Sequence, residues 1–292
     1  MMPIIDAHLH FSKGEGFDQI AKEAGHENIP QNLLEWFDKL HIVGAVAMGS
    51  SKNRPPHEVY CSSLDLCGPL DFNNYNQPPQ IGYCAGIESN DLNMHNLPHA
   101  VEEMEFHLQH DHCLGIKLYP GYNFHYVSDA IYEPFYDLAR RYHVPVAVHM
   151  GDPSSPQAIL KYAHPLSLDE AAVRHPDITF VMCHFGAPWV TDAAEVVYKN
   201  PNVYTDLSGL AAGQFCARDF MADYAHFAGS IMGALQYMGC YQKVLYGSDW
   251  PLVNLKSNID LIAALVPQKY HQDVFCNNAL SVYTRLQKYV NL

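Results

Sequence analysis

The stretch PIIDAHLH (residues 3–10) is an apolar run that ends in two histidines, His8 and His10, one residue apart. Near-continuous apolar runs are typical of strands in a parallel sheet that is covered on both faces. Residues i and i+2 of a strand point to the same face, so both imidazoles are expected on one side of the sheet. Spacing alone carries little weight, because the 18 histidines include a second pair with the same spacing, His110 and His112.

Seven further stretches have the same apolar or β-branched character. They predict strands at 42–50, 80–88, 114–120, 144–150, 178–185, 202–209 and 243–250. Helical periodicity separates most of them, as at 29–41 and 129–143. Eight strands alternating with helices predict an α/β fold, a TIM (β/α)8 barrel that forms a single domain over residues 1–292. A doubly wound sheet is the alternative, but no glycine-rich phosphate loop follows the first strand.

Three segments are too long for simple barrel turns, namely 51–79, 151–166 and 210–230. Long loops after barrel strands usually build the active-site face, so a distorted barrel with long active-site loops is expected. For 51–79, which is rich in Pro, Ser and Asn, a disordered surface insertion is the alternative.

Polar residues stand at the C-terminal ends of the predicted strands, which is where TIM barrels carry their chemistry. These residues are His8, His10, Lys117, His149, His184 and Asp249. Imidazoles and carboxylates are costly to bury there unless they are paired or coordinate a metal. Nitrogen and oxygen ligands suit Zn²⁺, Mn²⁺ or a similar divalent ion, so the set predicts a metal site.

Each of these residues also has a structural interpretation when it is taken singly. His149 or His184 alone would be a hydrogen-bonded core histidine, Asp249 could cap a turn, and Lys117 could form a buried ion pair. The metal interpretation therefore depends on the positions sharing one face. His110 and His112 follow a helical stretch and precede a strand, which predicts the opposite, N-terminal face and no catalytic role.

Composition narrows the class of protein. The formal net charge of −14 argues against binding to nucleic acid or to an anionic membrane. The sequence contains neither a signal-peptide pattern nor an apolar run long enough to span a bilayer, so a cytoplasmic location is expected. The eight cysteines are dispersed without a CxxC pair, which predicts reduced thiols and makes a sulfur-based zinc site unexpected.

The segments IIDAHLH, GIKLYP, VAVHMGD, FVMCHFG and VLYGSDWP resemble the strand signatures of the amidohydrolase superfamily. The similarity is greatest to the "amidohydrolase 2" branch, typified by aminocarboxymuconate-semialdehyde decarboxylase. It extends in order over nearly the whole chain, and the late VFCNNALSVY resembles the closing helix of that branch. The resemblance implies one catalytic divalent ion, most often zinc, with manganese or another divalent ion as alternatives.

Carried over by position, the resemblance implies the metal ligands His8, His10, His149 and Asp249, with His184 as a catalytic histidine beside them. Lys117 leaves an alternative open. In dinuclear members of the superfamily a lysine at this strand is carboxylated and bridges two ions, and the histidine of strand six binds the second ion. The form KLYP is that of the branch with one ion, so one ion is expected.

The function implied is a metal-dependent hydrolase acting on a C–O or C–N bond of a small carboxylate, amide, ester or lactone. Asp249 would take a proton from the attacking water, and His184 would stabilise the carbonyl oxygen. Residues flanking these positions are candidates for substrate contact: Lys117, Tyr119, Asp152, Trp189 and Trp250. Lys117 could pair with a substrate carboxylate, whereas packing of the barrel rim is an equal alternative for the two tryptophans.

Two other functions stay open. The first is a metal-dependent decarboxylase (a lyase) of an aromatic or enoic acid. Such enzymes of this branch usually place an arginine at the substrate carboxylate, and only Arg54 and Arg218 fall in loops that could reach the barrel mouth. The second is a barrel that binds a metal or ligand without turnover. A small-molecule substrate and a homodimer are the expected partners.

Overall fold

Eight parallel strands form a barrel in the computed structural model, which describes residues 2–50, 54 and 58–290. Their order around the barrel is β1-β2-β4-β5-β6-β7-β8-β9. The strands are β1 Ile4–Leu9, β2 Ile42–Met48, β4 Ile81–Ile87, β5 Cys113–Leu118, β6 Val146–Val148, β7 Phe180–Met182, β8 Val203–Asp206 and β9 Val244–Leu245. Each predicted strand overlaps one of these, so the prediction of an α/β barrel is confirmed.

The barrel closes between β1 and the chain that follows β9. The amide of Ala7 donates to the carbonyl of Tyr246 at 2.9 Å, and the amide of His10 donates to the carbonyl of Trp250 at 2.7 Å. Because these bonds replace a regular ladder, the first and last segments of the barrel are held together at the level where both carry polar side chains.

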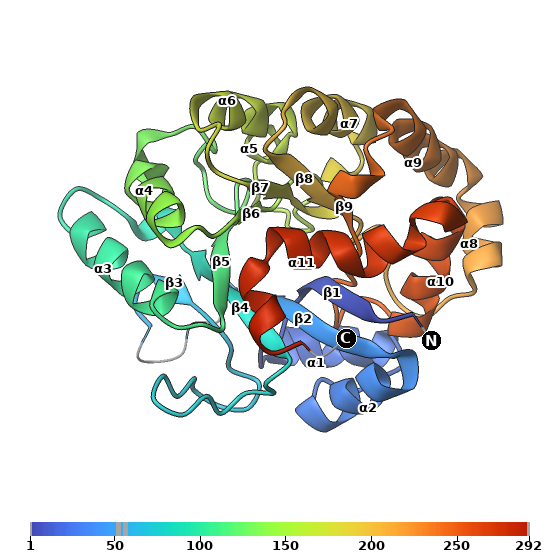
Figure 1. Ribbon diagram of the computed structural model, residues 1–292, viewed down its shortest axis with the longest axis horizontal. Helices are drawn as coiled ribbons and strands as arrows, with labels where there is room; N and C mark the ends of the chain where they lie inside the picture. Colours follow the sequence, from blue (N-terminus) through green and yellow to red (C-terminus); the bar gives the residue numbers. More distant parts are fainter. Residues whose placement is uncertain (1, 51–53, 55–57, 291–292) are drawn as a thin grey trace.

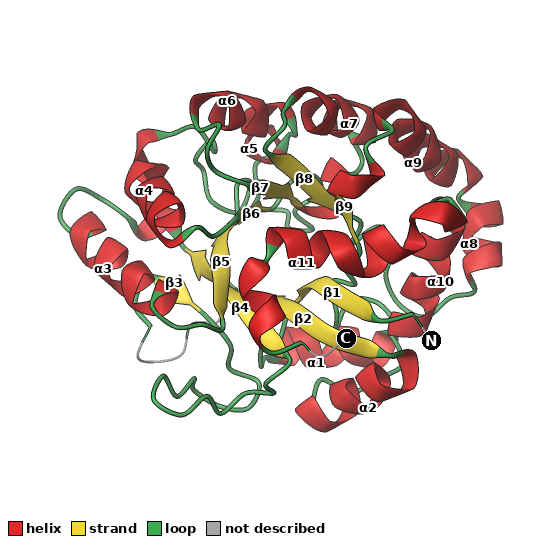
Figure 2. Ribbon diagram, viewed as in Figure 1, coloured by secondary structure: helices red, strands yellow, loops and turns green. Residues whose placement is uncertain are grey.

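Helices surround the strands (Figures 1 and 2). They are α1 Glu15–Glu23, α2 Pro30–Leu40, α3 Leu97–Leu108, α4 Glu133–Tyr142, α5 Leu160–Ala163, α6 Leu166–Arg174, α7 Val190–Lys199, α8 Ala217–Asp223, α9 Ala225–Met238, α10 Leu255–Leu265 and α11 Asn278–Val282. Each longer helix buries an apolar stripe; in α2 the stripe includes Leu33 and Phe37, one turn apart. None of the helices described here is long and apolar enough to cross a bilayer.

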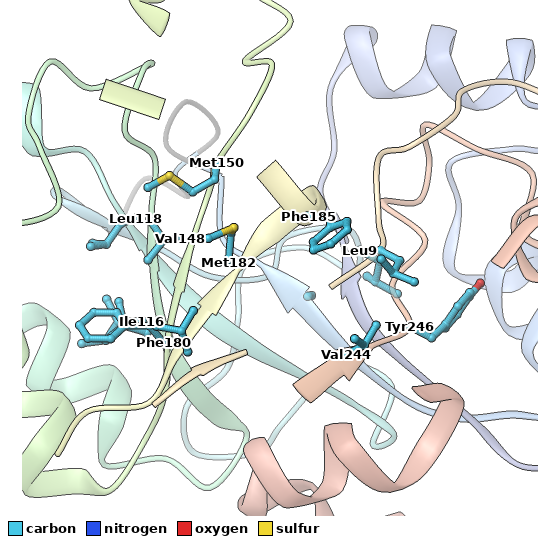
Figure 3. Packing of buried hydrophobic residues seen from close by; sticks show 14 of the residues in the cluster. Leu9, Ile116, Leu118, Val148, Met150, Phe180, Met182, Phe185, Val244 and Tyr246 are labelled. Atoms are coloured by element: carbon cyan, nitrogen blue, oxygen red, sulfur yellow. The ribbon is translucent and has the colours of Figure 1, made fainter. Parts of the chain in front are cut away.

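Alternation along the strands separates two apolar layers. Leu118, Val148 and Met182 belong to the layer that packs against the helices, and Figure 3 shows them on neighbouring strands. Residues of the opposite phase, such as Ala147 and Val181, belong to the barrel interior. This period of two decides which side chains at the strand ends face the barrel axis.

The C-terminal segment covers the N-terminal end of the barrel. Residues of α11 and the turn after it pack in the interior layer, among them Ala279, Val282 and Leu286. Arg285 donates to the carbonyls of Leu108 and Cys113, which flank the connection from α3 to β5. This end is therefore closed, which leaves the opposite end for a functional site.

The three predicted long loops contain structure that the sequence patterns did not indicate. Within 51–79, Cys61–Ser62 forms β3, which pairs antiparallel with β4. Part of that loop (51–53 and 55–57) lies outside the described residues. The segment 151–166 includes α5, and 210–230 includes α8 and the start of α9. Short helices were missed because one or two turns give too little periodicity to recognise.

Candidate metal centre

A β-bulge in β1 aims His8 and His10 at the barrel mouth. The register with β2 shifts between Asp6 and Leu9, where β1 holds one residue more than its partner. Before the shift Ile5 and Ala7 belong to the interior layer, whereas after it Leu9 belongs to the layer facing the helices. The even-numbered histidines therefore face inward together, as the period-two argument predicted, although the bulge itself was not anticipated.

Asp249 lies opposite the two histidines. Its Oδ1 is 3.4 Å from Nε2 of His8 and 3.2 Å from Nε2 of His10. Ligand atoms of these three residues all lie within 4.8 Å of one another, close enough to share one ion. Asp249 adopts a left-handed backbone conformation with φ of 62°, which is strained for a residue with a side chain and is often found at functional sites.

His149 and His184 extend this cluster from the ends of β6 and β7. Nε2 of His184 is 3.1 Å from Nδ1 of His149, and the rings of His8 and His184 have centroids 4.7 Å apart. His184 is also held in the left-handed region, with φ of 61°. The four predicted strand ends therefore meet at one place, although His149 is not in the group of ligand atoms that all lie within 4.8 Å of one another.

The three histidines predicted as ligands share one hydrogen-bonding pattern. Nδ1 of His8 contacts Oδ2 of Asp206 at 3.0 Å, Nδ1 of His10 contacts the carbonyl of Met48 at 3.3 Å, and Nδ1 of His149 contacts His184. When Nδ1 donates in this way, the tautomer is fixed and Nε2 keeps its lone pair.

The inward-facing atoms fit a metal ion. Nε2 of His8, Nε2 of His149 and Oδ1 of Asp249 are buried and have no hydrogen-bond partner among the described residues. Buried polar atoms are normally satisfied, so three neighbouring exceptions need an explanation. Two imidazole nitrogens and a carboxylate oxygen, with Nε2 of His10 beside them, are a donor set that Zn²⁺ accepts.

Electrostatics give these residues the protonation states of metal ligands. Burial, followed by the charge of Lys117, lowers the pKa of His8 to about 4. Burial, followed by His184 and Lys117, lowers the pKa of His149 well below its usual range. Burial opposes ionisation of Asp249, but the surrounding histidines still hold its pKa well below the ordinary value. Neutral imidazoles and an ionised carboxylate are the forms that bind metals.

Asp206, at the end of β8, is a central residue that the sequence analysis did not single out. Besides contacting Nδ1 of His8, it accepts from the backbone amide of His184 at 2.9 Å and from that of Ser208 at 3.1 Å. The hydroxyl of Ser208 in turn lies 2.9 Å from Nδ1 of His184. Asp206 ends β8 as observed but stands three residues before the end of the predicted strand 202–209, so the strand-end rule finds it only once the end of β8 is known.

Asp6 is a second residue that was missed. Its Oδ1 accepts from the backbone amides of His8 at 3.2 Å and Ser248 at 2.9 Å. It thereby ties β1 to the segment that carries Asp249. Burial raises the pKa of Asp6 to about 7.

Lys117 lies fully buried on β5 with its Nζ 2.8 Å from Sγ of Cys183. Cys183 also belongs to a second group of close ligand atoms, together with His8 and Asp206. In that group His8 and Asp206 already contact each other, and Cys183 already contacts Lys117. The atoms of this second group are therefore paired with one another or with Lys117. In the group of His8, His10 and Asp249, by contrast, Nε2 of His8 and Oδ1 of Asp249 have no hydrogen-bond partner among the described residues.

The cluster opens into a cavity of about 250 Å³. Its lining includes Lys117, Tyr119 and Asp152 among the residues predicted to contact substrate. Residues there that the sequence analysis did not name are Phe17, Ser50, Tyr122, Ser154, Ala187, Gly209 and Leu252. The hydroxyl of Tyr119 donates to the carbonyl of Gly49, which fixes its ring at the wall.

The two predicted tryptophans do not line this cavity. Trp250 is fully buried, and its Nε1 donates to Nδ1 of His26 at 2.9 Å, so its surroundings match the packing alternative. Trp189 is half-buried outside the cavity, with its ring 4.9 Å from the ring of His164.

Neither of the two arginines considered for a substrate carboxylate lines the cavity. Arg54 forms an ion pair with Asp91 at 3.1 Å and lines a neighbouring depression that shares Tyr122 with the cavity. The Arg218 side chain is 88% exposed and lies 3.5 Å from Asp219. Among the described residues that line the central cavity, Lys117 is the one cation other than histidine.

The chain is a (β/α)8 barrel whose histidine and aspartate cluster, at the C-terminal ends of the strands, could hold a metal ion where such barrels carry their active sites. The family model described as amidohydrolase matches residues 85–285, so the chain belongs to the amidohydrolase family. The predicted resemblance, including the amidohydrolase 2 branch, is therefore confirmed. The matched range includes His149, His184 and Asp249 but not His8 and His10.

Solved structures support the fold. An uncharacterised TIM-barrel protein from Bordetella bronchiseptica is similar over 98% of this chain and 99% of its own, with a TM-score of 0.66 and 17% identity. A "probable 2-pyrone-4,6-dicarboxylic acid hydrolase" from Acinetobacter baumannii is similar over 97% and 100%, with a TM-score of 0.63 and 15% identity. A 2,6-dihydroxybenzoate decarboxylase from Rhizobium is similar over 97% and 99%, with a TM-score of 0.61 and 15% identity. No curated protein matches the sequence.

Proposed function

We propose that the protein is a metal-dependent hydrolase in which His8, His10, His149 and Asp249 hold one divalent ion, with zinc the first choice. The observation that carries this proposal is the shared orientation of the three histidines. Nδ1 of each histidine contacts a protein group, so Nε2 is left to bind the ion. Nε2 of His8, Nε2 of His149 and Oδ1 of Asp249 have no hydrogen-bond partner among the described residues.

One ion is proposed rather than two. The lysine that would bridge a second ion, Lys117, has its Nζ against Cys183. His184, which would bind that ion, contacts His149 through Nε2 and Ser208 through Nδ1. The residues of a second site are therefore already partnered with protein groups.

When bound, a divalent ion polarises a carbonyl oxygen and lowers the pKa of a water ligand toward neutrality. Asp249, ionised and at the cavity wall, is the group proposed to accept the proton of the attacking water and return it to the leaving group. His184 lines the same cavity and is the proposed donor to the developing oxyanion; for this role its Nε2 carries the proton and gives up the contact with Nδ1 of His149. Asp206 and Ser208 orient it through its backbone amide and its Nδ1.

Hydrolysis is favoured over decarboxylation because, among the described residues, no arginine lines the central cavity. A decarboxylase of this branch is expected to place an arginine at the substrate carboxylate, and neither Arg54 nor Arg218 lines the central cavity; Arg54 is paired with Asp91 and Arg218 is exposed. The proposed substrates are small esters, lactones or amides, and a single substrate carboxylate would replace Cys183 as the partner of Lys117.

Side-by-side assays separate the two reactions. Protein reconstituted with Zn²⁺ is tested for hydrolysis of a panel of lactones, esters and amides, and for CO₂ release from a panel of aromatic and enoic acids. The unaltered protein is expected to hydrolyse at least one compound of the first panel, and Asp249→Asn is expected to lose that activity. Activity confined to CO₂ release would contradict the hydrolytic proposal, and the Asp249→Asn control guards against a contaminating enzyme.

A further inference from the structure

A second lobe continues the central cavity toward the outside of the barrel. It has a volume of about 330 Å³ and shares Asp152, Ala187 and Gly209 with the central cavity. Because three residues line both spaces, a molecule whose reacting group lies at the metal centre can extend into the lobe without leaving the protein surface.

Gly209 shows how close the lobe lies to the proposed catalytic residues. Its φ is +64°, and a Cβ added there would be 2.7 Å from Nδ1 of His184 and 3.2 Å from Oδ2 of Asp249. Gly209 therefore packs directly against both residues, and a side chain there would displace them. Because Gly209 also lines the lobe, the lobe begins beside His184 and Asp249.

The walls of the lobe beyond the three residues that it shares with the central cavity are apolar. They are formed by Leu160, Pro188, Trp189 and Phe227. Leu160 is 50% exposed, and Trp189 and Phe227 are half-buried, so a ligand would cover apolar surface that now faces solvent. The ring of Trp189 packs beside the ring of His164, which limits its freedom to turn away.

The charge of the lobe disfavours an anionic ligand. Asp152 stands where the lobe meets the central cavity, with its side chain exposed and its Oδ1 accepting from the amide of Ser154 at 3.0 Å. Among the described residues that line the lobe none is Lys, Arg or His, so a carboxylate placed there would meet a like charge without a counter-ion.

We infer that this lobe binds an uncharged aryl or alkyl arm of the substrate, so that the substrate is a hydrolysable group joined to an apolar arm rather than a dicarboxylate. The inference rests on the proposed function, because the metal centre holds the other end of the same molecule. Trp189, Phe227 and Leu160 are assigned as specificity residues.

Hydroxamates with one metal-binding head and different arms test this by calorimetry on the Zn²⁺-loaded protein. Acetohydroxamate has the head alone, 3-phenylpropanohydroxamate adds an apolar arm, and glutaric monohydroxamate adds a carboxylate arm. The phenyl arm is expected to improve Kd by about tenfold over the head alone, and the carboxylate arm is expected to give no improvement.

Variants locate the effect. Trp189→Ala should remove most of the gain from the phenyl arm while leaving acetohydroxamate unchanged, and Trp189→Phe should keep much of it. Leu160→Asp and Leu166→Asp make a matched pair, since the two leucines are 50% and 56% exposed but only Leu160 lines the lobe. Only Leu160→Asp should weaken binding of the phenyl compound.

Three results would overturn the inference while acetohydroxamate still binds: equal affinity for head and phenyl compound, tighter binding of the carboxylate arm, or equal effects of the two aspartate variants. Failure of acetohydroxamate itself to bind would instead overturn the proposed metal centre, and the inference with it. The two failures are therefore distinguishable by the head compound alone.

Discussion

Two His-x-His pairs of identical spacing have different surroundings in this molecule. His8 and His10 follow the bulge of β1 at the C-terminal end of the barrel, where Asp249 lies opposite them. His110 and His112 lie between α3 and β5 at the other end. The spacing is uninformative, and the position relative to a strand decides what the pair can do.

The packing of the second pair shows what distinguishes a site from a structural cluster. His112 is stacked between Tyr75 and Tyr289, with ring centroids 3.6 and 4.5 Å away. Nδ1 of His110 contacts the carbonyl of Phe106 at 2.9 Å. An unpartnered nitrogen is not the difference, since Nε2 of His112 also has no hydrogen-bond partner among the described residues. The difference is that rings flank His112, whereas a carboxylate and further imidazoles converge on His8.

The largest expected effect is the loss of Zn²⁺ binding when His8 and His10 are both removed. His8→Ala/His10→Ala should weaken Zn²⁺ binding by more than about 100-fold, beyond the effect typical of residues that only orient ligands. Hydrolysis should be lost with the metal. His110→Ala/His112→Ala is the matched control, and metal titration with a competing chelator measures both. Equal loss in the two double variants would break the comparison.

His184 should affect turnover more than it affects metal binding. His184→Gln removes the proposed donor to the oxyanion, so kcat of the Zn²⁺-saturated protein is expected to fall by about 10² to 10³. Loss of its contact with Nδ1 of His149 is expected to weaken Zn²⁺ binding by no more than the about 10- to 100-fold typical of a group that orients a ligand, so the metal content at saturation stays the same. Steady-state kinetics and metal analysis of one preparation measure both quantities. A fall in metal content parallel to the fall in kcat would assign His184 to the ligand set instead.

The metal-free protein should be sensitive to acid through His8. Its folded pKa of about 4 lies below the ordinary 6.5, so the unfolded chain binds the proton more tightly. The free energy of unfolding should therefore fall as the pH drops from about 6.5 to about 4, by roughly 3 kcal/mol from this group. Urea unfolding in EDTA measures it, and His8→Asn should flatten that part of the profile; an unchanged profile would contradict the assignment.

Asp206 should have a smaller effect on metal binding than the ligands. Asp206→Asn keeps the size of the side chain but weakens the contact that orients His8. Changing a residue that orients a metal ligand typically reduces metal affinity by about 10- to 100-fold. The chelator titration used for the histidine pairs measures this change. Affinity equal to that of the unaltered protein would show that His8 is oriented without it.

The smallest expected effect is on the opposite face. His112→Ala removes a ring stacked between two tyrosines, so the free energy of unfolding should fall by about 1–2 kcal/mol. Zn²⁺ affinity should not change, because the residue lies at the other end of the barrel. A loss of metal affinity in this variant would mean that the two ends are coupled.

The strands could be predicted because each is an apolar run between helical patterns. The site residues could be predicted because they are polar residues at the ends of those runs. His8, His10, His149, His184 and Asp249 were located by one rule, the C-terminal end of a barrel strand. Asp206 was not located by this rule, because it ends the observed β8 but stands three residues before the end of the predicted strand 202–209.

Other features could not be derived from local patterns. The bulge between Asp6 and Leu9 depends on pairing with β2. The lobe depends on Leu160, Trp189 and Phe227, which come from three separate segments and meet only in the folded chain. The sequence could not show that Trp250 belongs to the core and Trp189 to the surface of the lobe, because both stand near strand ends. Only tertiary contacts bury Trp250.

Metal content per chain tests the central claim most directly. Protein is loaded with Zn²⁺, freed of excess metal and analysed by mass spectrometry of the elements, beside His8→Ala and His110→Ala prepared in the same way. One equivalent is expected in the unaltered protein and in His110→Ala, and far less than one in His8→Ala. Far less than one equivalent in the unaltered protein, or unchanged content in His8→Ala, would contradict the proposed centre, and two equivalents would contradict the single ion.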